Sequence, residues 1–243
     1  TLFNIIPPFL NDLGINRKPF DSAIVLLLIR FIFDRIYEEN KLIRNEGEDL
    51  LHNLVNTTFA QLKPPEEFSP QVEDKSTRII DVFAYDEHFG VAVPPLQDML
   101  FCTNPFDILD CVDKSLFAIE KAATVYNNYQ TMVFPFEVTF ELFMAVAIGA
   151  QVSNWENMSV FVENYTPLSG LCPSFEFSKA KVVASAMQFQ VMVAEMNGEK
   201  PTEEIDDKAK KATQYAANYS ENLNDIVSNG IVTLPEPEIT ENT

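Results

Sequence analysis

Two carboxylates within an apolar segment, two histidines and three cysteines are the residues of this sequence that suggest chemistry. Glu137 and Glu141 are the only charged residues between positions 136 and 150, and a spacing of four places them on one face of a helix. The pair has two interpretations. Either it hydrates the start of an apolar helix, with Glu137 at the positive end of the helix dipole, or it presents an anion beside an apolar groove. Composition alone favours the first interpretation.

The histidines and cysteines do not form a catalytic or metal-binding set in the sequence. No ligand set surrounds His52 or His88, and the chain has no glycine-rich phosphate loop, Cys-x-x-Cys pair or His-Glu-x-x-His motif. Cys102, Cys111 and Cys172 are few and widely spaced, which indicates buried apolar fillers in a reducing compartment. We therefore expect no bond-making enzyme, no metal and no cofactor.

Composition indicates a globular protein that binds other proteins. The chain has 243 residues, of which 47% are apolar and 20 are phenylalanine, so it can bury a sizeable core. Its 36 acidic and 17 basic residues give a formal net charge of −19, which would repel nucleic acids and anionic lipids but attract a basic protein surface. The strongest apolar run, 23–33, is broken by Arg30 and is shorter than the roughly 20 residues of a membrane span. We expect a soluble, cytoplasmic protein without an integral membrane segment.

Apolar residues at helical spacing predict helices separated by short loops, with no alternating strand pattern. The expected helices span roughly 21–40, 45–62, 78–84, 96–101, 105–126, 136–150, 155–165, 178–196 and 202–228. The fold class that follows is all-α, an irregular layered helical bundle. We divide it into an N-terminal helical part (1–85), a core (86–197), a C-terminal helix (198–228) and an acidic, disordered tail (229–243).

Two of these helices are well signalled. Asn104 is a good N-cap, Pro105 fits the first helical position, and Asp107 suits the positive end of the dipole. The segment 136–150 is apolar on almost all sides, which is typical of a helix at the centre of a bundle.

Three stretches in this order resemble a known family. Residues 102–112 (CTNPFDILDCV) are similar to a Thr-Pro-x-Asp-Lys-Leu-x-x-Ile helix start. Residues 136–165 are similar to an acid-led apolar helix, a break and a helix ending in Tyr-Ile-x-x-Phe, and within 170–189 the sequence FEFS stands in place of Tyr-Tyr-Leu-Thr. The family is the vacuolar-protein-sorting-nine (Vps-nine) domain, a helical module that activates Rab-family GTPases. The resemblance covers roughly residues 20 to 195.

The resemblance implies roles for particular residues. In the family, an aspartate at the start of the apolar helix pairs with the lysine of the GTPase phosphate-binding loop, and a tyrosine binds the switch region. Here Glu137 stands for the aspartate, Phe175 for the tyrosine without its hydroxyl, and Ser178 for a threonine at the helix N-cap. We expect Glu137 and Phe175 to act in nucleotide exchange. The expected partner-binding residues are Phe136, Phe140, Glu141, Ser178 and Lys179.

Three functions stay open from the sequence. The first is a guanine-nucleotide exchange factor for an endocytic Rab-type GTPase, which requires Glu137 and Phe175 in one exposed groove. The second is a catalytically weakened scaffold of the same fold that binds a GTPase without exchange. The third is an unrelated acidic helical adaptor, in which Phe175 is buried and Glu137 is merely solvated.

Overall fold

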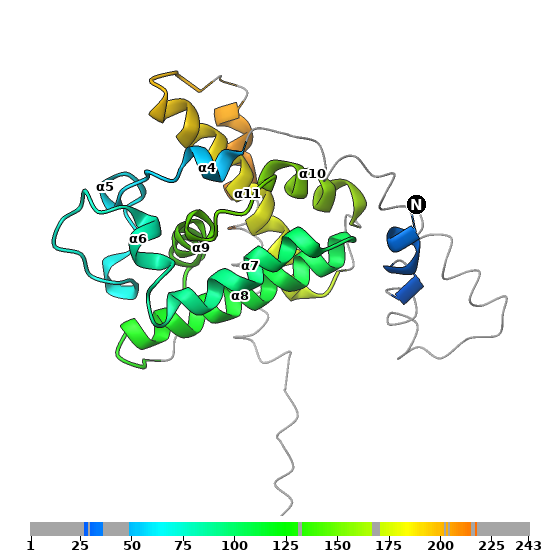
Figure 1. Ribbon diagram of the computed structural model, residues 1–243, viewed down its shortest axis with the longest axis horizontal. Helices are drawn as coiled ribbons and strands as arrows, with labels where there is room; N and C mark the ends of the chain where they lie inside the picture. Colours follow the sequence, from blue (N-terminus) through cyan, green and yellow to red (C-terminus); the bar gives the residue numbers. More distant parts are fainter. Residues whose placement is uncertain are drawn as a thin grey trace, which may run out of the picture.

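The computed structural model describes residues 27–28, 30–35, 49–130, 133–166, 171–201, 203, 205–214 and 217. These residues are predominantly helical (Figure 1), and the only β pairing among them is an isolated antiparallel bridge between Thr58 and Arg78. The fold is therefore all-α, as the sequence predicts. Its α-helices are α4 (Leu50–Asn53), α5 (Phe59–Leu62), α6 (Ile79–Phe83), α7 (Val93–Asp98), α8 (Pro105–Tyr126), α9 (Phe136–Ala150), α10 (Trp155–Tyr165) and α11 (Pro173–Met196), and its 3-10 helices are η2 (Glu66–Phe68), η3 (Phe89–Ala92) and η4 (Met99–Phe101).

Helix α9 forms the centre of the bundle. Figure 1 looks nearly along its axis, with α6 and α8 beside it. Elements α6, α7, α8, α11 and η3 all contact α9. Every residue of α9 from Leu142 to Ala150 is buried. Full burial of one large apolar side chain contributes roughly 1.5–3 kcal/mol, so this helix is a main source of the hydrophobic stabilisation. The predicted central helix and its bounds are confirmed.

Helix α8 begins where its sequence signals predict. The Asn104 side-chain oxygen accepts hydrogen bonds from the backbone N–H groups of Phe106 (3.1 Å) and Asp107 (3.0 Å). Pro105 occupies the first helical position, where its missing N–H costs nothing. The helix runs to Tyr126, so its predicted length is also confirmed.

The prediction of one helix over 45–62 is wrong in the part that the structure describes. Two short helices, α4 and α5, are separated by residues 54–58. There the backbone pairs with a distant segment: Phe59 N–H donates to Thr77 O (3.0 Å) and Ile79 N–H donates to Thr57 O (2.8 Å). These bonds satisfy backbone groups that a continuous helix would otherwise pair locally.

Part of the predicted helix 21–40 is described, at 27–28 and 30–35, and it is helical there. Figure 1 draws this segment beside the ends of α8 and α10. Phe33 is buried and packs edge-on against Phe161 and Tyr165 of α10. Residues 205–214 of the predicted helix 202–228 are helical, whereas the predicted lead-in (1–16) and tail (229–243) lie outside the described residues. Among the described residues, no helix combines the length and apolarity needed to cross a membrane.

Candidate functional site

The first turns of α9 carry the two carboxylates that the sequence singles out. Glu137 is exposed in the first turn, and Glu141 lies half-buried one turn later. Burial raises the pKa of Glu141, and the nearby charge of Glu137 raises it further. The two side chains therefore share one face of the helix. Glu137 is the one whose carboxylate is open to an approaching partner.

Phe136 and Phe140 belong to the core and do not line an open groove. Only 4% of Phe136 and 7% of Phe140 is exposed. Their rings stack on each other with centroids 5.3 Å apart. The expectation that these two residues bind a partner therefore needs correction: the apolar face of α9 is already covered by the protein itself.

Lys181 of α11, which sequence reasoning missed, lies against this aromatic pair. Its side chain is fully buried. The Nζ atom donates to the Phe136 carbonyl oxygen (3.1 Å) and to Thr139 Oγ1 (2.6 Å). It also lies 3.9 Å from the centre of the Phe136 ring and 4.9 Å from that of Phe177, distances at which ring faces attract a cation. Lys181 thus joins α11 to the first turn of α9.

The burial of Lys181 disfavours its charged form. Burial lowers its pKa well below the usual 10.5, while the charges of Glu120 and Glu137 act in the opposite direction. A lysine is almost never fully buried without a partner, so composition alone predicts exposure. The sequence gives no signal for this burial, because its neighbours at helical spacing, Ser178 and Ser185, are small polar residues that only the structure shows to be buried.

Helix α11 begins at Pro173, five residues before the predicted start at 178. Proline fits the first helical position because its fixed backbone angle is already helical. Ser178 is consequently inside the helix and is not its N-cap. It is fully buried, and its hydroxyl has no hydrogen-bond partner within the described part of the chain. Ser178 is therefore not available to a partner.

Two predicted residues of α11 keep some exposed surface. Phe175 is half-buried against the core, and Lys179 is half-buried as well. Burial lowers the pKa of Lys179, and the charges of Glu163 and Glu176 oppose that shift. These two side chains, with Glu137 and Glu141, are the part of the predicted site that can meet another molecule.

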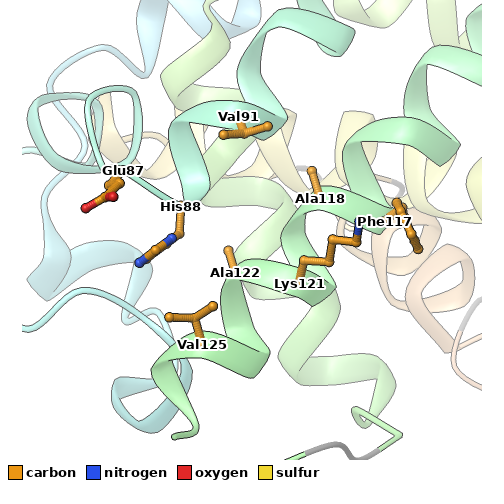
Figure 2. A pocket seen from close by; sticks show the side chains of 8 residues that line it. All are labelled: Glu87, His88, Val91, Phe117, Ala118, Lys121, Ala122 and Val125. Carbon is orange, nitrogen blue, oxygen red and sulfur yellow. The ribbon is translucent and has the colours of Figure 1, made fainter. Parts of the chain in front are cut away.

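A second surface feature, a pocket between η3 and α8, was not predicted (Figure 2). It has a volume of about 310 Å³ and an apolar floor that includes Ala118 and Ala122. Small residues four apart leave a hollow on a helix, and this spacing is the sequence signal that could have indicated it. The pocket is lined by Glu87, His88, Val91, Phe117, Ala118, Lys121, Ala122 and Val125.

Among the described residues, no three His, Cys, Asp or Glu side chains are grouped to hold a metal ion. The structure brings the rings of Phe136, Phe140 and Phe177 together around Lys181, while Glu137 is exposed and Phe175 is half-buried. Comparisons with protein families, with curated proteins and with solved structures find no match for this chain.

Proposed function

We propose that this chain binds a Rab-family small GTPase of the endocytic pathway and promotes release of GDP from it. The observation that carries the proposal is the link between α11 and α9 through Lys181, whose Nζ donates to the Phe136 carbonyl oxygen. This contact fixes the first turn of α9, with exposed Glu137, against the helix that presents Phe175. Such a function implies a cytoplasmic protein that acts at endosomes.

The mechanism follows from competition between anions. The phosphates of a bound nucleotide are held by a lysine of the GTPase, and a carboxylate that pairs with this lysine weakens their binding. Glu137 has the charge and the exposure for that role, because it is exposed in the first turn of a helix whose residues from Leu142 to Ala150 are buried in the core. A rigid support matters, since a misplaced catalytic group loses much of its effect. The formal net charge of −19 favours the approach of a basic partner surface.

A second candidate is a scaffold that binds the GTPase without releasing its nucleotide. The burial of Phe136, Phe140 and Ser178 favours it, because these residues are then missing from the contact surface. Phe175 also lacks a hydroxyl group, so it offers a ring face but no hydrogen bond. The two candidates share a binding surface and differ in whether Glu137 accelerates nucleotide release.

The first test measures release of a fluorescent GDP analogue from a panel of endocytic Rab-type GTPases. With wild-type protein we expect accelerated release from at least one of them. Glu137→Ala should slow the accelerated release by about 30-fold or more, because losing one partner of a desolvated charge pair costs at least ~2 kcal/mol. Glu87→Ala is the matched control: it removes an exposed carboxylate beside the η3–α8 pocket and should leave the rate unchanged.

Binding of the same GTPases, measured by calorimetry, separates the candidates. Binding without faster release supports the scaffold and contradicts the exchange factor. If no GTPase of the panel binds, both candidates fail and the unrelated adaptor remains. An equal loss of exchange in Glu137→Ala and Glu87→Ala would mean that overall charge, and not the position of Glu137, drives release.

A further inference from the structure

Two of the three cysteines lie side by side where η4 meets α8. The Sγ atoms of Cys102 and Cys111 are 3.7 Å apart. Cys102 is the C-cap of η4 and is half-buried, whereas Cys111 is buried in the second turn of α8. Cys172 is exposed. The sequence indicates isolated apolar fillers, because the eight residues between Cys102 and Cys111 do not reveal that the turn before α8 brings the two thiols together.

The two thiols influence each other's ionisation. Hydrogen bonding from Cys102 lowers the pKa of Cys111, and the charge of Lys114 contributes in the same direction. The pKa of Cys102 is raised by the same interaction and by burial. When one of the two thiols loses its proton, the thiolate is therefore favoured at Cys111. Burial and the charges of Asp110 and Asp98 act in the opposite direction on the pKa of Cys111.

We propose that Cys102 and Cys111 are a redox-responsive modification site that forms a reversible disulfide when the chain meets a low-molecular-weight disulfide such as oxidised glutathione. Cys102, the more exposed thiol, passes its proton to the neighbouring Cys111 thiolate as it attacks one sulfur of oxidised glutathione, which forms a mixed disulfide and releases one glutathione thiolate. Cys111 then gives that proton to the released glutathione thiolate, attacks Cys102 Sγ, closes the intramolecular bond and displaces the second glutathione. The chain loses two electrons and two protons, and the external disulfide gains them as two thiols.

The bond would act on the segment 27–35 that docks against α8. A disulfide requires the sulfur atoms to approach from 3.7 Å to about 2.05 Å, and we expect Cys102, which follows η4 in extended backbone, to move more than Cys111 within α8. The next residue, Thr103, donates its hydroxyl to the Asp34 carboxylate. A few residues on, Asp107 accepts from the Arg30 guanidinium at 2.9 Å. Oxidation therefore weakens the contacts that hold this segment, whether or not the partner is a GTPase.

Formation of the disulfide is tested by intact mass and peptide mapping of the full chain in a Cys172→Ser background, after incubation with oxidised glutathione. We expect a loss of two hydrogens, a cross-linked peptide containing Cys102 and Cys111, and full reversal by dithiothreitol. Adding Cys111→Ser should instead leave a lasting glutathione adduct on Cys102. A stable adduct in the Cys172→Ser protein itself, or no reaction at either cysteine, would overturn the proposal.

The effect on the segment is tested by hydrogen exchange of the oxidised and reduced forms. Amide exchange in residues 30–35 should be about three- to thirtyfold faster after oxidation, as expected when one hydrogen bond and one surface ion pair are weakened. Exchange in α9 is the internal control and should not change. A disulfide that forms but leaves exchange in 30–35 unaltered would contradict the coupling to this segment.

Discussion

Lys181 makes the stability of the fold depend on pH in a predictable direction. Its pKa in the folded chain lies well below 10.5 because it is buried. Between that lowered value and 10.5, the unfolded chain holds a proton on Lys181 that the folded chain lacks. The free energy of unfolding therefore rises with pH in this window, by at most about 1.4 kcal/mol per pH unit, and the contribution is lost as the pH falls.

The measurement is a comparison of urea unfolding for wild type and Lys181→Met. Their difference in unfolding free energy should increase by about 1 kcal/mol or more in favour of wild type between about pH 8 and pH 10. Lys114→Met is the control. Asp110 raises the pKa of the exposed Lys114. The difference in unfolding free energy between wild type and Lys114→Met should therefore not increase over this pH range. A flat difference for Lys181→Met would show that Glu120, Glu137 and the aromatic rings keep Lys181 charged.

At the scale of single elements, the sequence predicted the helices whose signals are local. Asn104 and Pro105 fixed the start of α8, and the unbroken apolar run fixed α9. The break between α4 and α5 was not predictable, because it depends on pairing of Thr57 and Phe59 with residues far along the chain. The early start of α11 could have been predicted from Pro173.

The N-cap of α8 offers a test at this scale. Asn104→Ala removes a buried side chain that accepts from two backbone N–H groups and also donates to the Asp107 carboxylate at 2.7 Å. We expect a loss of about 0.5–2 kcal/mol in unfolding free energy, seen as a lower urea midpoint with an unchanged slope. The control is Asn154→Gly at the start of α10. Asn154 makes no side-chain cap bond there and has φ of 59°, a conformation that glycine adopts without strain.

Comparing the unfolding free energies of these two variants separates the loss of the helix cap from a general effect of replacing an asparagine. Asn104→Ala should be clearly less stable than wild type, whereas Asn154→Gly should be close to it. Equal destabilisation by both would contradict the role given to Asn104. Because Asp107 also binds Arg30, Asn104→Ala should further loosen the segment 27–35.

At the scale of the whole molecule, composition and periodicity were enough to predict an all-α bundle around an apolar centre. They were not enough to predict which residues of the predicted site are buried and which are exposed. Phe136, Phe140 and Ser178 are covered by packing between α9 and α11, which arises from tertiary structure and not from spacing along the chain. The residues of the predicted site that keep exposed surface are Glu137, Glu141, Phe175 and Lys179.

At the scale of the whole molecule, the net charge also affects the rate at which a charged partner associates with the protein. A formal net charge of −19 accelerates the encounter with a basic surface by long-range attraction. Raising the ionic strength from about 0.01 M to about 0.15 M shortens the Debye length from about 30 Å to about 8 Å, which removes most of this attraction. For a GTPase that binds this chain, stopped-flow association should slow by about tenfold or more over that range.

Dissociation should change much less, because it depends on contacts at the interface that salt screens weakly. Glu87→Ala and Glu137→Ala each remove one charge of a large excess, so both should keep nearly the same salt dependence of association. They should differ only in nucleotide release. If association were insensitive to salt, the acidic surface would play no part in partner capture, and binding would depend on the local fit around Glu137 and Phe175 alone.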